Sequence, residues 1–243
     1  MKLFLRALLA LLLPPLAGCS SLYFPPPPQV PLLTQKGEFS GGIHTNLDNN
    51  VSLQGAYAIT DHLGAMGSAS FMHTDKKRKV LDHDFGEIGL GYYTRLSDRR
   101  VLEIYGGLGG GNSKRVERNA EKVVTRTLEG GLTKYFAQIN YSSKDNNNVH
   151  LFGHDFPISY GTALRVSYLQ LDNFKLDGAA QLGEENVFLE PITYTRVQLV
   201  GPVQLQLISG SNFGLRQRKF LKAANSVFNF GIVVNIGGQE GKR

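Results

Sequence analysis

The residues from Val51 to Phe71 alternate between larger apolar side chains and small or polar ones, and this alternation constrains the fold more than any other feature. One side of an extended chain would carry Val51, Leu53, Gly55, Tyr57 and Ile59, and the opposite side Ser52, Gln54, Ala56 and Ala58. After a polar break at 60–62, a second run alternates in the same way, with Leu63, Ala65, Ala69 and Phe71 on one side. A period of two on both sides of a short break predicts a β-hairpin.

Related patterns continue toward the C-terminus and predict an all-β fold. Ten segments are candidate strands: 38–46, 50–59, 63–73, 84–95, 101–111, 126–141, 158–171, 187–199, 202–211 and 226–236. The sixth segment changes phase near Thr133, which predicts a bulge or a misplaced strand boundary there, and Pro191 weakens the strand around it. Because 243 residues suffice for one β domain, we predict a single up-and-down antiparallel barrel of about ten strands, or eight if two segments are loops.

Alternation alone does not separate a soluble barrel from a transmembrane one, so two further features are needed. Most lysines fall between the strands, with Lys134 as the exception; they are Lys76, Lys77, Lys79, Lys114, Lys144, Lys219 and Lys222. The connections near 60–62, 96–100 and 200–202 are short, and those near 74–83, 112–125, 172–186 and 212–225 are long and polar. Short periplasmic turns and long outer loops are typical of transmembrane β-barrels, although the 47–49 and 142–157 links do not follow the pattern.

The first nineteen residues predict a signal peptide followed by a lipid anchor. Lys2 and Arg6 precede an apolar run from Ala7 to Leu13, which is too short to span a bilayer. Leu16-Ala17-Gly18-Cys19 then resembles the bacterial lipobox, in which the cysteine becomes the lipid-modified first residue. By the same resemblance, Ser20 after the cysteine favours sorting to the outer membrane. A chain with one cysteine has no intrachain disulfide.

The domain organisation follows from these segments. We predict a signal peptide at 1–18, a lipid-anchored Pro-rich tether at 19–36, the barrel at 37–238 and a tail at 239–243. The proline run 25–28 and Pro31 predict an extended polyproline II spacer that keeps the lipid and the folded domain apart. With Cys19 on the periplasmic side, counting strands up and down places all four long loops outside.

Charge and the glycine-rich stretch exclude several classes of function. Removal of the signal peptide leaves 24 basic against 20 acidic side chains, and a net charge of +4 does not indicate nucleic-acid binding. The stretch 106–111 has five glycines, but it ends a strand and opens no helix, so it is not a dinucleotide fingerprint. Curvature or a crowded barrel wall is the better explanation for it.

Two groups of histidines are candidate sites. His150 and His154 lie four residues apart, but Gly153 and Pro157 indicate a loop, and no third metal ligand stands at a clear spacing. An outer loop gathers five candidate residues of a rim hydrolase or acyltransferase: His73, Asp75, Asp82, His83 and Asp84. Neither a nucleophile nor a base with an orienting partner can be assigned among them, so a solvated loop is favoured.

If the apolar face points to lipid, seven polar residues point into the lumen: Glu87, Arg95, Glu103, Arg165, Glu190, Arg196 and Gln198. Three acids and three arginines nearly cancel, which predicts ion pairs across the bore, because an unpaired buried charge is costly. Side chains fill a barrel of about eight strands, whereas open channels have about 16 to 18. We therefore predict a narrow or closed lumen.

The hairpin Ala56-Tyr57-Ala58-Ile59-Thr60-Asp61-His62-Leu63-Gly64 looks like those of small outer-membrane β-barrels. Together with Cys19, Tyr23, Pro31-Leu32-Leu33 and Lys36-Gly37-Glu38, it makes the chain similar to uncharacterised Bacteroidota-type β-barrel lipoproteins. The resemblance covers nearly the whole chain and brings no catalytic residues.

We therefore predict an outer-membrane lipoprotein, lipid-anchored at Cys19, with its N-terminus on the periplasmic side. Its role would be structural, in transport, or in binding through the outer loops, with no enzymatic activity, cofactor or metal. Its partners would be membrane lipid and an unidentified solute or surface ligand. Two alternatives stay open: a lipid-tethered soluble β-barrel that binds a ligand in the periplasm, and a rim enzyme using His73, Asp82 or His83.

Overall fold

The computed structural model describes residues 21–47, 49–151, 153–222 and 227–238, and these ranges are all-β, with no helix among them. Ten strands build the main sheet: β1 (Phe39–Thr45), β2 (Asn50–Ala58), β3 (Leu63–Lys76), β4 (Lys79–Ser97), β5 (Arg100–Arg118), β6 (Val124–Leu151), β7 (His154–Leu176), β9 (Glu185–Val200), β10 (Val203–Gly210) and β12 (Val227–Ile236). Two short strands, β8 (Ala179–Ala180) and β11 (Phe213–Gly214), lie at its margin. No helix within the described residues is long and apolar enough to cross a membrane.

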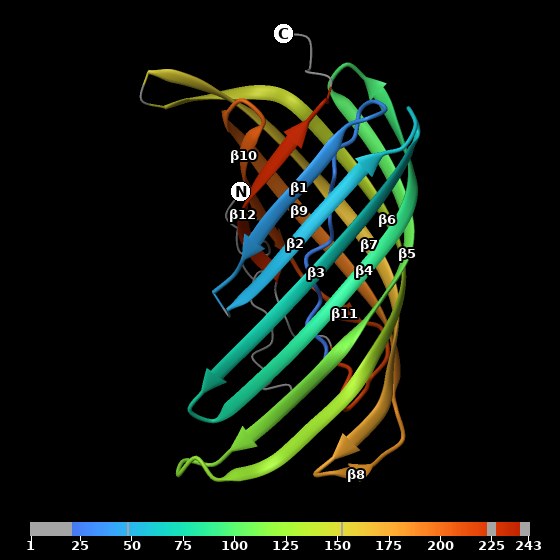
Figure 1. Ribbon diagram of the computed structural model, residues 1–243, viewed down its shortest axis with the longest axis vertical. Helices are drawn as coiled ribbons and strands as arrows, with labels where there is room; N and C mark the ends of the chain where they lie inside the picture. Colours follow the sequence, from blue (N-terminus) through green and yellow to red (C-terminus); the bar gives the residue numbers. More distant parts are fainter. Residues whose placement is uncertain (1–20, 48, 152, 223–226, 239–243) are drawn as a thin grey trace, which may run out of the picture.

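The ten strands form one closed antiparallel barrel (Figure 1), which confirms the predicted fold. Neighbours in the sheet are neighbours in sequence, apart from the small interruptions at β8 and β11. The ring closes where β1 pairs with β12, from Phe39 opposite Ile236 to Thr45 opposite Phe230. Every long strand therefore has a hydrogen-bonded neighbour on both sides, and the barrel has no free edge.

The two faces of the wall follow the period-two pattern of the sequence. On β2 the side chains of Val51, Leu53 and Tyr57 are exposed on the outside, while Ser52 and Gln54 are buried on the inside. The glycine-rich part of β5 lies opposite two inward aromatic rings. A Cβ atom on Gly107 would come within 2.5 Å of the Phe136 ring, and one on Gly109 within 2.9 Å of the Phe85 ring. The crowded-wall interpretation of this stretch is therefore correct.

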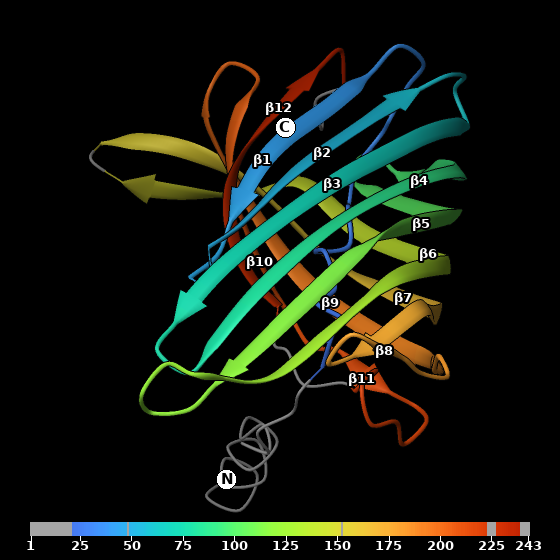
Figure 2. The ribbon, with the colours of Figure 1, turned by 60° about the horizontal axis from the view of Figure 1, so that its bottom comes forward.

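Three connections expected to be loops are mostly strand. β3 and β4 continue to a tight turn at 77–78, and β5 and β6 continue to 118 and 124, so the links at 74–83 and 112–125 are largely hairpin. The 142–157 link is also paired, and with it β6 and β7 form an arm that projects from the barrel (Figures 1 and 2). Backbone pairing continues beyond the predicted strand ends, where fewer side chains are buried, so the hydrophobic alternation fades before the strands end.

Two local predictions concern the regularity of single strands, and the one for β6 is wrong. The β6 strand keeps its phase through Thr133, and the irregularity lies on β7, which has one extra residue where Glu129 and Gly131 pair with Lys175 and Asp172. Pro191 does not interrupt β9. Its carbonyl accepts from the Ser211 N–H, so its missing N–H faces the gap between β10 and β11, where no strand partner needs it.

The N-terminal segment 21–37 runs inside the barrel (Figure 1), and we call it the luminal segment. Leu22, Tyr23, Val30, Leu32 and Leu33 are fully buried within it, so these residues lie inside the folded domain and do not form the predicted spacer between that domain and the lipid. Moving apolar side chains out of water lowers the free energy of the folded state. The proline run 25–28 suits the interior because proline carries no backbone N–H that would need a buried acceptor.

The luminal segment spans the barrel from one end to the other. At its start the Ser21 hydroxyl donates to the Lys222 carbonyl at 3.0 Å, at the end that carries the long hairpins. At its finish the Lys36 N–H donates to Asp61 at 3.0 Å, at the end that carries the short turns. Cys19, on which the predicted periplasmic side of the N-terminus rests, lies outside the described residues.

Candidate functional site

The centre of the lumen holds a cluster of two carboxylates and two basic side chains that come from four different strands. Lys134 Nζ lies 2.8 Å from Glu87 and 3.3 Å from Glu190. Arg165 Nη1 lies 2.8 Å from Glu87 and 4.0 Å from Glu190. All four side chains are almost completely buried, and their formal charges cancel. We call these four residues the central charge cluster.

The luminal segment completes the hydrogen bonds of this cluster. The Tyr23 hydroxyl donates to Glu190 at 2.8 Å, and its ring packs on Phe188 with a centroid distance of 5.0 Å. Arg165 Nε donates to Gln138 at 2.7 Å, and Gln138 donates in turn to the Gln29 carbonyl at 2.6 Å. The barrel wall and the segment therefore share one polar network.

Glu103 binds the backbone of the luminal segment. Its two carboxylate oxygens accept from the N–H groups of Leu32 at 3.3 Å and Leu33 at 3.1 Å. Tyr105 and Asn140 also donate to it, each at 3.1 Å. Leu32 has a φ of 65°, a left-handed conformation that is uncommon for leucine, and it turns two successive N–H groups toward one carboxylate.

Arg196 binds the two backbone carbonyl groups that directly precede Leu32 in the luminal segment. Its guanidinium donates to the carbonyls of Val30 and Pro31, the latter at 3.3 Å, and to Gln206 at 2.9 Å. The guanidinium carbon also lies 5.5 Å from the centre of the Tyr194 ring, within the range of a cation–π contact. The buried Arg196 and Glu103 therefore form hydrogen bonds with the backbone of the luminal segment rather than an ion pair with each other.

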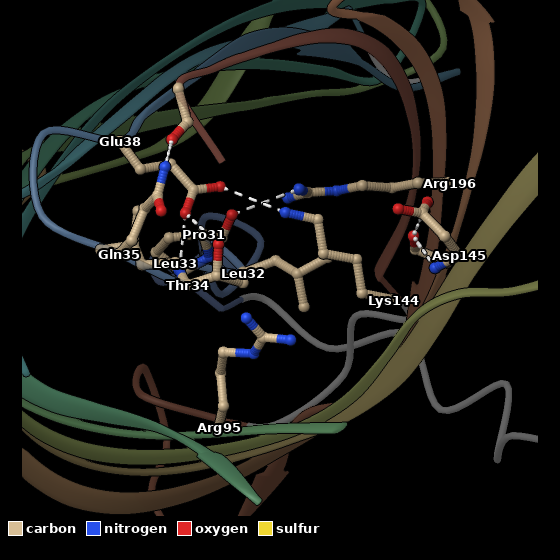
Figure 3. A network of polar contacts seen from close by, with 12 residues as sticks. Pro31, Leu32, Leu33, Thr34, Gln35, Glu38, Arg95, Lys144, Asp145 and Arg196 are labelled. Carbon is tan, nitrogen blue, oxygen red and sulfur yellow. Dashed lines mark hydrogen bonds and ion pairs between the residues drawn. The ribbon is translucent and has the colours of Figure 1, made fainter. Parts of the chain in front are cut away.

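A second ion pair lies at the short-turn end of the lumen (Figure 3). Glu38 accepts from the N–H and hydroxyl of Thr34, the hydroxyl at 2.8 Å, and its other oxygen lies 3.4 Å from Lys144 Nζ. Arg95 projects from β4 toward the same group, and its guanidinium donates to the Asp98 carbonyl at 3.0 Å. These contacts hold the segment where it joins β1.

The long-hairpin end is covered by the connection between β11 and β12. Phe220 and Leu221 turn inward and are buried, and the carboxylate of Glu184 accepts from the N–H groups of both, at 2.8 and 3.0 Å. Leu22 donates its N–H to the Phe220 carbonyl at 3.0 Å. The start of the luminal segment and this connection therefore close the mouth together.

Glu185 lies beside this cover on the outside of the wall. The Tyr168 hydroxyl donates to its carboxylate, and the Arg216 guanidinium lies 2.5 Å from it. Both contacts favour the ionised form and hold the pKa of the Glu185 carboxyl below its ordinary value.

Apolar packing adds to these polar contacts along the whole segment. Leu22 and Tyr23 belong to a cluster with Phe85, Phe188 and nearby leucines at the long-hairpin end. Val30 packs with Ile192 and Tyr194 at mid-height, and Leu33 packs with Ala58 and Tyr93 near the short turns. Each fully buried side chain of this size stabilises the folded state by about 1.5–3 kcal/mol.

The predicted lumen residues are only partly brought together. Glu87, Arg165 and Glu190 meet as ion pairs, whereas Glu103 and Arg196 contact the luminal segment. Arg95 and Gln198 lie near the short turns, where Gln198 donates to the Gly201 carbonyl at 2.9 Å.

Sequence reasoning missed the basic partner of the cluster, Lys134, and the Glu38–Lys144 pair. Lys134 carried a usable signal, because it is a lysine within a strand of an otherwise lysine-poor wall, at an inward position. Lys144 lay in a link expected to be a loop, so its inward direction could not be read from the pattern.

The rim residues are not assembled into one site. His73 Nδ1 lies 2.5 Å from Asp82 on the exposed outer face. His83 is fully buried inside, with its ring stacked 5.8 Å from that of Phe85. Adjacent residues of a strand point to opposite faces, so Asp82 and His83 cannot join in one reaction centre. Asp75 pairs instead with Arg118 at 3.0 Å, and Asp84 is exposed.

The two other candidate histidines, His150 and His154, lie at the tip of the arm. His150 Nδ1 lies 3.0 Å from Asp155, and Leu151 pairs with His154 in the β6–β7 ladder, so the segment is a hairpin rather than a helix or a loop. Among the described residues, no group of three or more potential ligands is arranged to hold a metal. A cavity of about 450 Å³ lies outside the lumen, between this arm and the β9–β10 turn.

Comparisons with known proteins do not assign the chain to a family. The chain matches no protein-family model, and no curated protein matches it either.

Proposed function

We propose that the protein is an outer-membrane lipoprotein whose β-barrel is sealed by its own N-terminal segment. In this proposal residues 1–18 are the signal peptide and Cys19 carries the lipid. The barrel serves as a stable platform for its long outer hairpins, in a structural or surface-binding role, rather than as a channel. The observation that carries the proposal is the burial of the luminal segment along the full length of the lumen.

The outer face of the barrel supports a lipid environment. On β2, β10 and β12 the outward positions carry no charged side chain, and large apolar residues are exposed on every one of these strands. Five aromatic side chains face outward near the short-turn end, as the interface girdles of membrane barrels do: Phe39, Tyr57, Tyr92, Tyr141 and Tyr160. A soluble periplasmic barrel, the main alternative, would expose this apolar face to water.

The filled lumen supports a closed barrel. The charged groups of the central charge cluster pair with one another and with the luminal segment. At the height of this cluster, therefore, no continuous path lined by solvated groups crosses the lumen. The filled lumen equally disfavours a lipocalin-like binding role, because a ligand would have to displace the luminal segment.

The separation of His73 and Asp82 from His83 disfavours the rim-enzyme alternative. The His73–Asp82 pair is exposed, and its geometry is that of a solvated surface contact.

Fractionation and bilayer recording test the proposal. The full-length protein should sediment with outer membranes, need detergent for extraction, and show heat-modifiable mobility on a gel. In planar bilayers the purified protein should give no large stable conductance. Recovery in aqueous buffer without detergent would support the soluble alternative, and a large steady conductance would contradict the sealed lumen.

A further inference from the structure

The direction of the luminal segment has a topological consequence. Its C-terminal end joins β1 at the short-turn end, where the Gly37 N–H donates to the Ala58 carbonyl at 2.9 Å. Its first described residue, Ser21, lies at the opposite end beside Lys222. In Figures 1 and 2 the blue chain can be followed inside the barrel between these ends.

The wall holds the segment at successive levels, so this path is a built feature of the lumen. From the short turns toward the long hairpins, the contacts are Leu33 to Glu103, Pro31 to Arg196, Gln29 to Gln138, Pro27 to Gln54 and Tyr23 to Glu190. Most of these wall side chains are polar and buried, and each would lose a partner without the segment.

We propose, resting on the proposed function, that the luminal segment is a threaded tether that delivers the lipid on Cys19 through the barrel. Cys19 precedes Ser21 by two residues in the sequence, and successive Cα atoms are about 3.8 Å apart, so a lipid on Cys19 is tied covalently to the end of the barrel at which Ser21 lies. The lipid therefore inserts into the membrane leaflet beside the long hairpins, not the one beside β1.

The barrel's architecture identifies that leaflet as the outer one. Membrane barrels keep short turns in the periplasm and long connections outside. β1 begins and β12 ends at the short-turn end, so the strands start and finish in the periplasm. The lipid anchor is then displayed at the cell surface, which replaces the expectation of an N-terminus on the periplasmic side.

A tether fixed at both ends also constrains assembly. One end continues covalently into β1, and the other carries acyl chains that stay in the membrane. The β1–β12 pairing must therefore form around the segment, because a lipidated end would not pass through a lumen already closed and filled by the central charge cluster.

Epitope insertion in the full-length protein tests the proposal. Three variants carry the same short tag: between Ser20 and Ser21, after Lys77 in the β3–β4 turn, and after Asp98 in the β4–β5 turn. Antibody binding is measured on intact and on permeabilised cells. We expect the first two tags to be detected on intact cells, and the Asp98 tag only after permeabilisation.

Each other pattern has a defined meaning. If the tag between Ser20 and Ser21 is detected only under the condition in which the Asp98 tag is detected, the two lie on the same side of the membrane and the threaded path is wrong. Detection of the first two tags only after permeabilisation would overturn the surface position of the lipid. Outer-membrane fractionation and heat-modifiable mobility are measured on the same samples, so a failure of the membrane barrel itself is recognised separately.

Discussion

The hydroxyl of Tyr23 donates a 2.8 Å hydrogen bond to Oε1 of Glu190, although 167 residues separate them in the chain. The other carboxylate oxygen of Glu190 lies 3.3 Å from Lys134. This one bond therefore links the luminal segment to the central charge cluster, and it makes the two features a single structural unit.

Replacing Tyr23 by phenylalanine tests that link with little change in packing. The ring contact with Phe188 should remain, while Glu190 loses a buried donor, so we expect the free energy of unfolding to fall by about 1–3 kcal/mol. Tyr57→Phe is the matched control, because Tyr57 is exposed on the outer face, and it should stay within about 0.5 kcal/mol. Urea unfolding in detergent measures both, and equal effects would contradict the link.

The Lys134→Met variant tests the charge balance of the lumen. It leaves Glu87 and Glu190 with Arg165 as their only basic neighbour in the cluster, and breaking a buried ion pair in this way costs about 3–5 kcal/mol. Lys114→Met removes an exposed pair with Glu129 at 3.8 Å and should cost no more than about 1 kcal/mol. Adding Glu87→Gln to Lys134→Met should recover part of the loss. No recovery would show that lost packing, rather than charge, dominates.

Valine at Gly64 tests the fit of the luminal segment against the wall. A Cβ atom there would lie 2.6 Å from Leu33 Cδ1, so the fully buried Leu33 side chain must move, at a cost of about 1–3 kcal/mol. Gly55→Val is the control, since a Cβ at Gly55 meets nothing within 4 Å. The temperature at which gel mobility changes should drop for the first variant and stay unchanged for the second. A drop of the same size in both would mean that strand glycines matter for other reasons.

Removing the Glu103 carboxylate tests whether the segment seals the barrel. The carboxylate accepts four hydrogen bonds, two of them from the segment's backbone, so Glu103→Ala should loosen the segment near Leu32 and Leu33. We expect brief conductance events in planar bilayers where the unmodified protein is silent. Asp98→Ala, on an exposed turn, should be silent too. A silent Glu103→Ala protein with normal stability would argue that the seal does not depend on this contact.

Much of the fold was predictable because side-chain alternation is a local signal. All ten main strands were found, the two faces of β2 were separated correctly, and the residues expected to point inward on β4, β5, β7 and β9 include the buried Glu87, Glu103, Arg165, Glu190 and Arg196. The ends of the long strands were not found, because paired backbone in a solvated hairpin has no apolar face to mark it. Asp177-Gly178, a two-residue turn with both φ angles positive, was a usable hairpin signal that went unused.

The candidate site was predictable only in part. Inward direction followed from the strand pattern, so Glu87, Glu103, Arg165, Glu190 and Arg196 were correctly placed in the lumen. Their partners were not predictable, because pairing depends on which strands face each other across the bore and at what height. Lys134 shows the difference: its position in a strand was visible, but its contacts with Glu87 and Glu190 join three strands that are far apart in sequence.

The sequence by itself determined the ten strand segments and which side chains share a face of each strand, since these depend on neighbours within a few residues. Only the tertiary structure decided where the proline-rich segment lies. A run of prolines with scattered apolar residues is compatible with a solvated spacer and also with an extended segment buried inside a barrel. Its own residues do not favour either arrangement. The choice depends on whether a surface exists that offers acceptors, donors and apolar contacts at matching heights. Glu103, Arg196, Gln138 and Glu190 provide that surface only once the barrel closes.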